Sequence, residues 1–153
     1  MAFKRTFGGP TEGMVGLYDL HNQVGQVPGK GAAANNGRSD LIVVQYLLIG
    51  AYRGGVAPLG APMTADGAFG RQTHYWLLYF RGDCEQALGA KLVDPPGVVL
   101  PFGNAVSRSS MIFQLNKRFR AANPGVGSGL GFDGTDPKMP LNIKKVFADI
   151  GEF

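Results

Sequence analysis

The hydrophobic residues of this chain gather in three segments, separated by stretches rich in Gly, Pro and polar residues. In the first segment, residues 41–51, four apolar residues recur at the i, i+3, i+4 and i+7 spacing of one helix face: Val44, Leu47, Leu48 and Ala51. Other apolar residues cover a second face, which is typical of a helix buried on more than one side. We expect Ser39 or Asp40 to cap its start. The β-branched residues at 41–44 leave a buried strand as the competing interpretation.

The second and third segments also show helical spacing. Residues 73–81 place Trp76, Leu77 and Phe80 on one face, with Gly82 as the expected stop. A short helix over residues 83–92 is the alternative continuation. Residues 107–122 form the third predicted helix, whose apolar face consists of Met111, Ile112, Leu115 and Phe119. Residues 98–100 form a short strand-like run.

Glycine and proline dominate the flanks, with 24 Gly and 10 Pro in 153 residues. The apolar islands at 14–18 and 24–27 are too short for helices and favour short strands or an arm lying on the helices. We therefore predict a mostly α protein in three parts. These are an extended N-terminal arm at 1–39, a helical domain at 40–122, and a Gly-rich loop and C-terminal tail at 123–153.

A tight turn is predicted between the first two helices, at Asp66-Gly67-Ala68-Phe69-Gly70. Gly67 and Gly70 are expected to adopt positive φ, which glycine tolerates best, and Asp66 to bind backbone amides two residues ahead. Phe69 is expected to point inward as a plug between the helices. The hydroxyl of Thr73 is expected to cap the second helix.

Residues 40–81 resemble the peptidoglycan-binding-like domain family, a small three-helix fold. The similarity rests on Val44-Gln45-Tyr46-Leu47-Leu48 followed by Asp66-Gly67-Ala68-Phe69-Gly70-Arg71-Gln72-Thr73. The resemblance implies a shallow ligand groove beside the helices. It implies structural roles for Gln45, Asp66, Gly67, Phe69, Gly70 and Thr73. The residues that could supply aromatic faces and oriented polar groups for a ligand are Arg71, Gln72, His74, Tyr75 and Tyr79.

The net charge and the reactive side chains limit the classes of partner and of chemistry that we expect. The net charge of +4 and a pI near 9.4 favour an anionic partner, but no run of basic residues indicates specific nucleic-acid binding. A single cysteine, Cys84, excludes an internal disulfide, and with His21 and His74 as the two histidines no zinc set is expected. A Cys84–His74 nucleophilic pair has no flanking signature. We expect no enzyme activity and no cofactor.

No secretory signal and no membrane span is expected from the sequence. Synthesis in the cytoplasm is the expectation, followed by incorporation into a particle or delivery to the cell envelope by a non-classical route. The predicted function is a non-enzymatic module that binds peptidoglycan or another anionic cell-wall polymer. The alternative is a structural subunit of a phage tail, an injection system or a similar assembly, with self-association or neighbouring subunits as partners.

Overall fold

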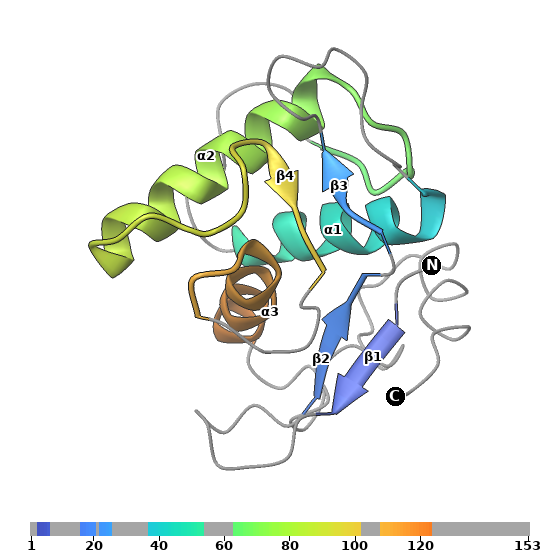
Figure 1. The fold of residues 1–153 in the computed structure, drawn as a ribbon. Helices are drawn as coiled ribbons and strands as arrows, with labels where there is room; N and C mark the ends of the chain where they lie inside the picture. The colour runs from blue at the N-terminus through green and yellow to red at the C-terminus, as the bar shows by residue number, and fades with distance from the viewer. Residues whose placement is uncertain are drawn as a thin grey trace.

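The computed structural model describes residues 3–6, 16–20, 22–25, 37–53, 63–101 and 108–123, with backbone alone at 3–6 and 16–19. The described part is mostly helical, as predicted (Figure 1). Its helices are α1 (Arg38–Ala51), α2 (Arg71–Leu88) and α3 (Met111–Ala122). Strands β1 (Phe3–Thr6) and β2 (Gly16–Asp19) form one antiparallel pair, and β3 (Val24–Gly25) and β4 (Val98–Val99) form another.

Helix α1 is the centre of the hydrophobic core. Every residue from Leu41 to Leu48 is buried, which confirms a helix covered on several sides and excludes a strand at 41–44. Figure 1 shows α2 on one side of α1 and α3 on the other. The approach of α3 is close because Gly50 leaves room for the ring of Phe119, which a Cβ at this position would overlap. The chain therefore covers the second face of α1 with its own elements.

The start of α1 differs from the prediction. The helix begins at Arg38, and its N-cap is Gly37, which provides no side-chain hydrogen bond. Asp40 is instead buried in the first turn, where its Oδ2 accepts a hydrogen bond of 3.3 Å from the backbone N–H of Asn22. Ser39 and Asp40 are thus not caps, because the carboxylate of Asp40 binds the segment that leads into β3 rather than its own helix.

Helix α2 confirms the predicted buried face but is longer than predicted. Trp76, Leu77 and Phe80 are buried, and the helix continues through Gly82 to Leu88. A glycine inside a helix costs only about 1 kcal/mol relative to alanine, so contacts further along the helix can outweigh it. The helix ends at the left-handed Gly89, which has a φ of 67°.

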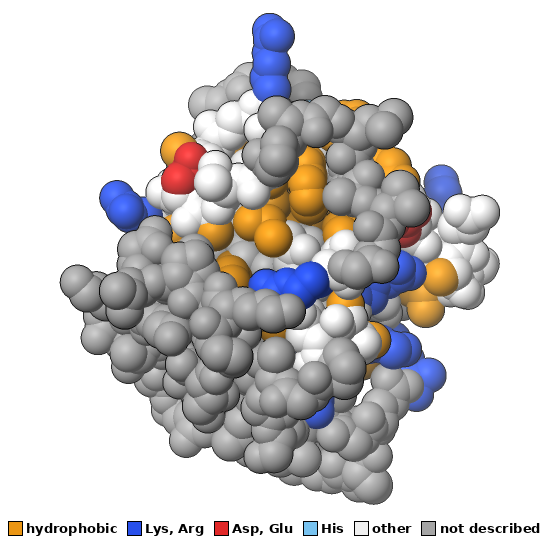
Figure 2. Space-filling model, turned by 180° about the vertical axis from the view of Figure 1, so that it is seen from behind, with side chains coloured by type: hydrophobic (Ala, Val, Ile, Leu, Met, Phe, Trp, Pro, Cys, Tyr) orange, Lys and Arg blue, Asp and Glu red, His pale blue; other side chains and the backbone are white. Residues whose placement is uncertain are grey.

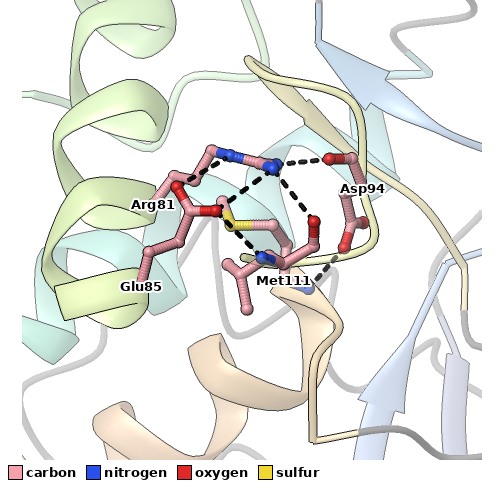
Figure 3. Close-up of polar contacts among 5 residues, drawn as sticks. Arg81, Glu85, Asp94 and Met111 are labelled. Carbon is pink, nitrogen blue, oxygen red and sulfur yellow. Dashed lines mark hydrogen bonds and ion pairs between the residues drawn. The ribbon is translucent and has the colours of Figure 1, made fainter. Parts of the chain in front are cut away.

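A cluster of charged residues, with Arg81 and Asp94 buried and Glu85 half-buried, supplies those contacts (Figure 3). Arg81 forms an ion pair with Glu85 one turn later, at 3.3 Å between Nε and Oε1. Its guanidinium also donates to the backbone carbonyls of Leu92, at 3.0 Å, and of Asp94. Glu85 in turn accepts a hydrogen bond of 2.9 Å from the N–H of Leu92. These bonds fix the segment after α2 against the second half of the helix.

The carboxylate of Asp94 connects the same segment to α3. Its Oδ1 accepts a hydrogen bond of 2.7 Å from the N–H of Met111, the first residue of α3, and its Oδ2 accepts one of 2.8 Å from Leu100. Ser110 caps the helix as well, since its Oγ accepts from the N–H of Phe113. Helix α3 therefore begins at Met111, four residues later than the predicted start at residue 107. Burial raises the pKa of Asp94 above its ordinary value, against the effect of these hydrogen bonds.

The flanks are described in part. Short strands were predicted at the apolar islands 14–18 and 24–27, and β2, which ends one residue beyond the first island, and β3 confirm them; β4 confirms the strand-like run at 98–100. Val24 pairs with Val99, so the N-terminal flank contacts the helical part through a sheet. The predicted Gly-rich loop and tail lie outside the described residues, apart from the single residue Asn123.

Candidate functional site

Gln45 is the polar centre of the predicted turn motif. Its side chain is 1% exposed and extends from α1 toward the turn. The two N–H groups of its Nε2 are shared among three acceptors: the Thr73 hydroxyl at 3.1 Å, the Ala68 carbonyl at 3.0 Å and Asp66 Oδ1 at 3.3 Å. Its Oε1 accepts from the N–H of Gly67 at 2.9 Å. One buried amide thus connects α1, the turn and the start of α2.

The turn itself confirms two predictions. Asp66 Oδ1 accepts a hydrogen bond of 2.9 Å from the N–H of Ala68, two residues ahead. Gly67 has a φ of 75°, and a Cβ added there would lie 2.6 Å from Cγ of Arg38 and 3.1 Å from Cγ1 of Ile42. Both the backbone conformation and the lack of space therefore require glycine at this position.

Two other predictions for the motif are wrong. Gly70 has a φ of −152°, an extended conformation open to any residue, because it is the N-cap of α2. The hydroxyl of Thr73 does not cap α2, since it accepts a hydrogen bond from Gln45. Phe69 is half-buried against the core, and its ring centre lies 6.3 Å from that of His74, so it fills the predicted position only in part.

A cavity of about 250 Å³ opens at this turn and at the first residues of α2. It is smaller than the roughly 300–1,000 Å³ of sites for drug-sized ligands. Its walls combine apolar and polar groups, contributed by Met63, Thr64, Asp66, Phe69, Arg71 and Gln72 beside the buried motif residues. The cavity therefore matches the size of a single amino-acid or sugar residue.

The five predicted ligand residues separate into two sets. Arg71 and Gln72 line the cavity. His74, Tyr75 and Tyr79 are not among its lining residues. Tyr75 is 44% exposed, and its ring centre lies 6.4 Å from that of the half-buried Tyr79, so the two tyrosines form a separate aromatic surface along α2.

Sequence reasoning missed Met63 and Thr64 as lining residues. They lie in the connection before the turn, where no periodic pattern places a side chain. Their position immediately before the motif is the one signal that could have drawn attention to them.

The geometry also bears on the candidate nucleophilic pair. His74 and Cys84 lie ten residues apart on one helix, a separation of about 15 Å along its axis. Cys84 is fully buried, and this burial raises the pKa of its thiol to about 12. The two residues are therefore not brought together, and the thiol stays protonated at neutral pH.

Within the described ranges, His, Cys, Asp and Glu nowhere form a group of three or more that could hold a metal ion. None of the helices described has the combination of length and apolar character needed to cross a membrane. In comparisons with known proteins, no family model, no curated protein and no solved structure matches the chain.

Proposed function

We propose that this chain is a non-enzymatic binding module that recognises cell-wall peptidoglycan, with a peptidoglycan-binding-like core over residues 40–81. The observation that carries the proposal is the hydrogen-bonding of Gln45, which joins the Asp-Gly turn to both helices. The motif on which the resemblance rests thus acts as one unit, and this unit forms walls of the cavity.

The charge distribution supports an anionic polymer as the partner. The chain carries a net charge of +4, and basic side chains project at several points of the face seen in Figure 2, where few acidic ones show. Arg71 and Gln72 supply donors at the cavity. The aromatic surface of Tyr75 and Tyr79 begins one turn after Arg71, within reach of the next unit of an extended ligand.

A pull-down with purified sacculi across a salt series tests this function. The intact chain is expected to bind, and Gln72→Ala and the double change Tyr75→Ala, Tyr79→Ala are expected to weaken binding at every salt concentration. Gln86→Ala is the matched control, because Gln86 is an exposed glutamine of α2 outside the cavity lining. A folded chain that leaves sacculi unbound at all salt concentrations would overturn the proposal.

We propose a structural subunit of an ordered assembly as the second candidate, on the basis of the outer face of α2. Tyr75 and Leu78 are 44% and 40% exposed, and a Cβ added at Gly82 would meet no atom within 4 Å. An exposed apolar helix face of this kind is typical of contacts between proteins. Light scattering distinguishes the candidates. An assembly subunit forms defined oligomers that Leu78→Glu disrupts, whereas a binding module has the same mass with leucine or glutamate at position 78.

A further inference from the structure

Two opposite charges line the cavity at the start of α2 without pairing with each other. Asp66 uses its Oδ1 for the N–H of Ala68 and the amide of Gln45, and no donor of the described part contacts its Oδ2. The guanidinium of Arg71 forms no hydrogen bond or ion pair with any described residue. Both side chains are exposed, so a carboxylate and a guanidinium are available to a ligand in one small space.

This arrangement selects against ligands that carry a single charge. An anion that approaches Arg71 also meets the carboxylate of Asp66, and a cation that approaches Asp66 also meets the guanidinium. A ligand with an ammonium and a carboxylate on one residue satisfies both. The backbone N–H groups at the start of α2 add positive potential on the Arg71 side, because this turn has no side-chain cap and no acidic residue to offset it.

The remaining walls fit the same kind of ligand. Met63 and Phe69 offer apolar surface for a short methylene chain, and Thr64 and Gln72 offer neutral hydrogen-bonding groups. The volume of about 250 Å³ leaves room for one residue rather than for a peptide.

We propose that this cavity binds the free zwitterionic end of a stem-peptide residue, with Asp66 binding its ammonium and Arg71 its carboxylate. This inference rests on the peptidoglycan-binding function proposed above and names the part of the polymer that the cavity recognises. The tyrosine surface lies outside the cavity lining and is not part of it.

The test starts from sacculi whose stem peptides carry a residue with a free amine and a free carboxylate, and compares three forms of them. One form is native, the second is acetylated at its amines, and the third is amidated at its carboxylates. The chain should bind native sacculi roughly ten-fold more tightly than either modified form, because each modification removes one charge-assisted hydrogen bond.

Two variants assign each charge to its partner. Asp66→Asn retains the Oδ1 acceptor for Ala68 and Gln45 and removes only the charge, so it should abolish the preference for native over acetylated sacculi. Arg71→Gln should abolish the preference for native over amidated sacculi. Lys91→Gln is the control for loss of an exposed positive charge, because Lys91 lies beyond α2, outside the cavity lining, and it should preserve both preferences.

The possible failures are distinct. If all three forms of sacculi bind equally well to the intact chain, the zwitterion site is refuted while the wall-binding function stands. If preferences exist but Asp66→Asn and Arg71→Gln leave both unchanged, recognition lies elsewhere and the inference is also refuted. If no form of sacculi binds, the proposed function itself fails. Urea unfolding of each variant establishes that the binding measurements compare folded proteins.

Discussion

Replacing Gln45 by leucine removes the amide that joins the turn to the two helices while keeping a side chain of similar volume. The change leaves the N–H of Gly67 and the hydroxyl of Thr73 without this partner, and Thr73 is buried. Ala68 belongs to an exposed part of the turn, where water can replace the lost donor to its carbonyl. An unsatisfied buried hydroxyl costs about 1–3 kcal/mol, and the lost hydrogen bond of the half-buried Gly67 N–H about 1 kcal/mol more, so we expect the free energy of unfolding to fall by about 2–4 kcal/mol.

Urea unfolding followed by circular dichroism measures this loss, and Gln114 provides the comparison. Gln114 is equally buried, on α3, but the hydrogen bond described for it is a single one, from its Nε2 to the carbonyl of Arg108 at 2.7 Å. Gln114→Leu is therefore expected to lower the free energy of unfolding by about 1 kcal/mol. A loss for Gln45→Leu no larger than that for Gln114→Leu would refute the central role given to Gln45.

Gln45→Glu provides a second measurement with a defined pH dependence. The new carboxylate keeps an acceptor for Gly67 but loses the donors, and it faces Asp66 Oδ1, which lies 3.3 Å from the native amide nitrogen. Burial and the neighbouring carboxylate would raise the pKa of the introduced carboxyl group in the folded state above its unfolded value. The variant should therefore be more stable in acid, and its stability should decrease as the pH rises through the folded-state pKa.

Three further predictions use the same unfolding assay or a chemical probe. Gly67→Ala should lower the free energy of unfolding by about 1–3 kcal/mol because of its positive φ and close neighbours. Gly70→Ala should cost less, about 0.5–1 kcal/mol, because alanine is a poorer N-cap than glycine but fits the extended backbone there; equal losses would contradict the assignment of the turn. The pKa of Asp94 in the folded state is raised above 3.8, so its contribution to stability is largest below that pH and decreases as the pH rises. Asp94→Asn should remove this part of the pH dependence of unfolding. A pH profile identical to that of the unchanged protein would contradict the raised pKa. Cys84 should resist a thiol reagent at neutral pH in the folded chain and react fully in denaturant, whereas rapid labelling of the folded chain would show that the thiol is accessible.

The pattern of hydrophobic residues was sufficient to predict the three helices but not their ends. Apolar spacing depends on the core, and residues 41–48 are buried as that spacing indicates. The ends depend on distant partners that no local pattern records. Helix α2 passes Gly82 because Arg81 and Glu85 bind a segment that follows the helix, and Asp40 is not a cap because it binds Asn22.

The candidate site was predictable where its contacts are local or follow the motif. The hydrogen bond from Ala68 to Asp66 spans two residues, and the positive φ of Gly67 follows from the turn. Gly70 was predicted wrongly because the same residue type serves both in left-handed turns and at extended helix starts. That Arg71 and the tyrosines belong to different surfaces depends on the packing of α2, which the motif does not specify.

The far end of α2 offers a convenient attachment point for biophysical work. Helix α2 has 18 residues and therefore extends about 27 Å from the cavity to Gly89, where an added Cβ would meet no atom within 4 Å. The neighbouring Ala90 is exposed, and a cysteine placed there would be the reactive thiol, since Cys84 is buried. A fluorophore or a surface tether on this residue would orient the cavity away from the support and report ligand capture by single molecules.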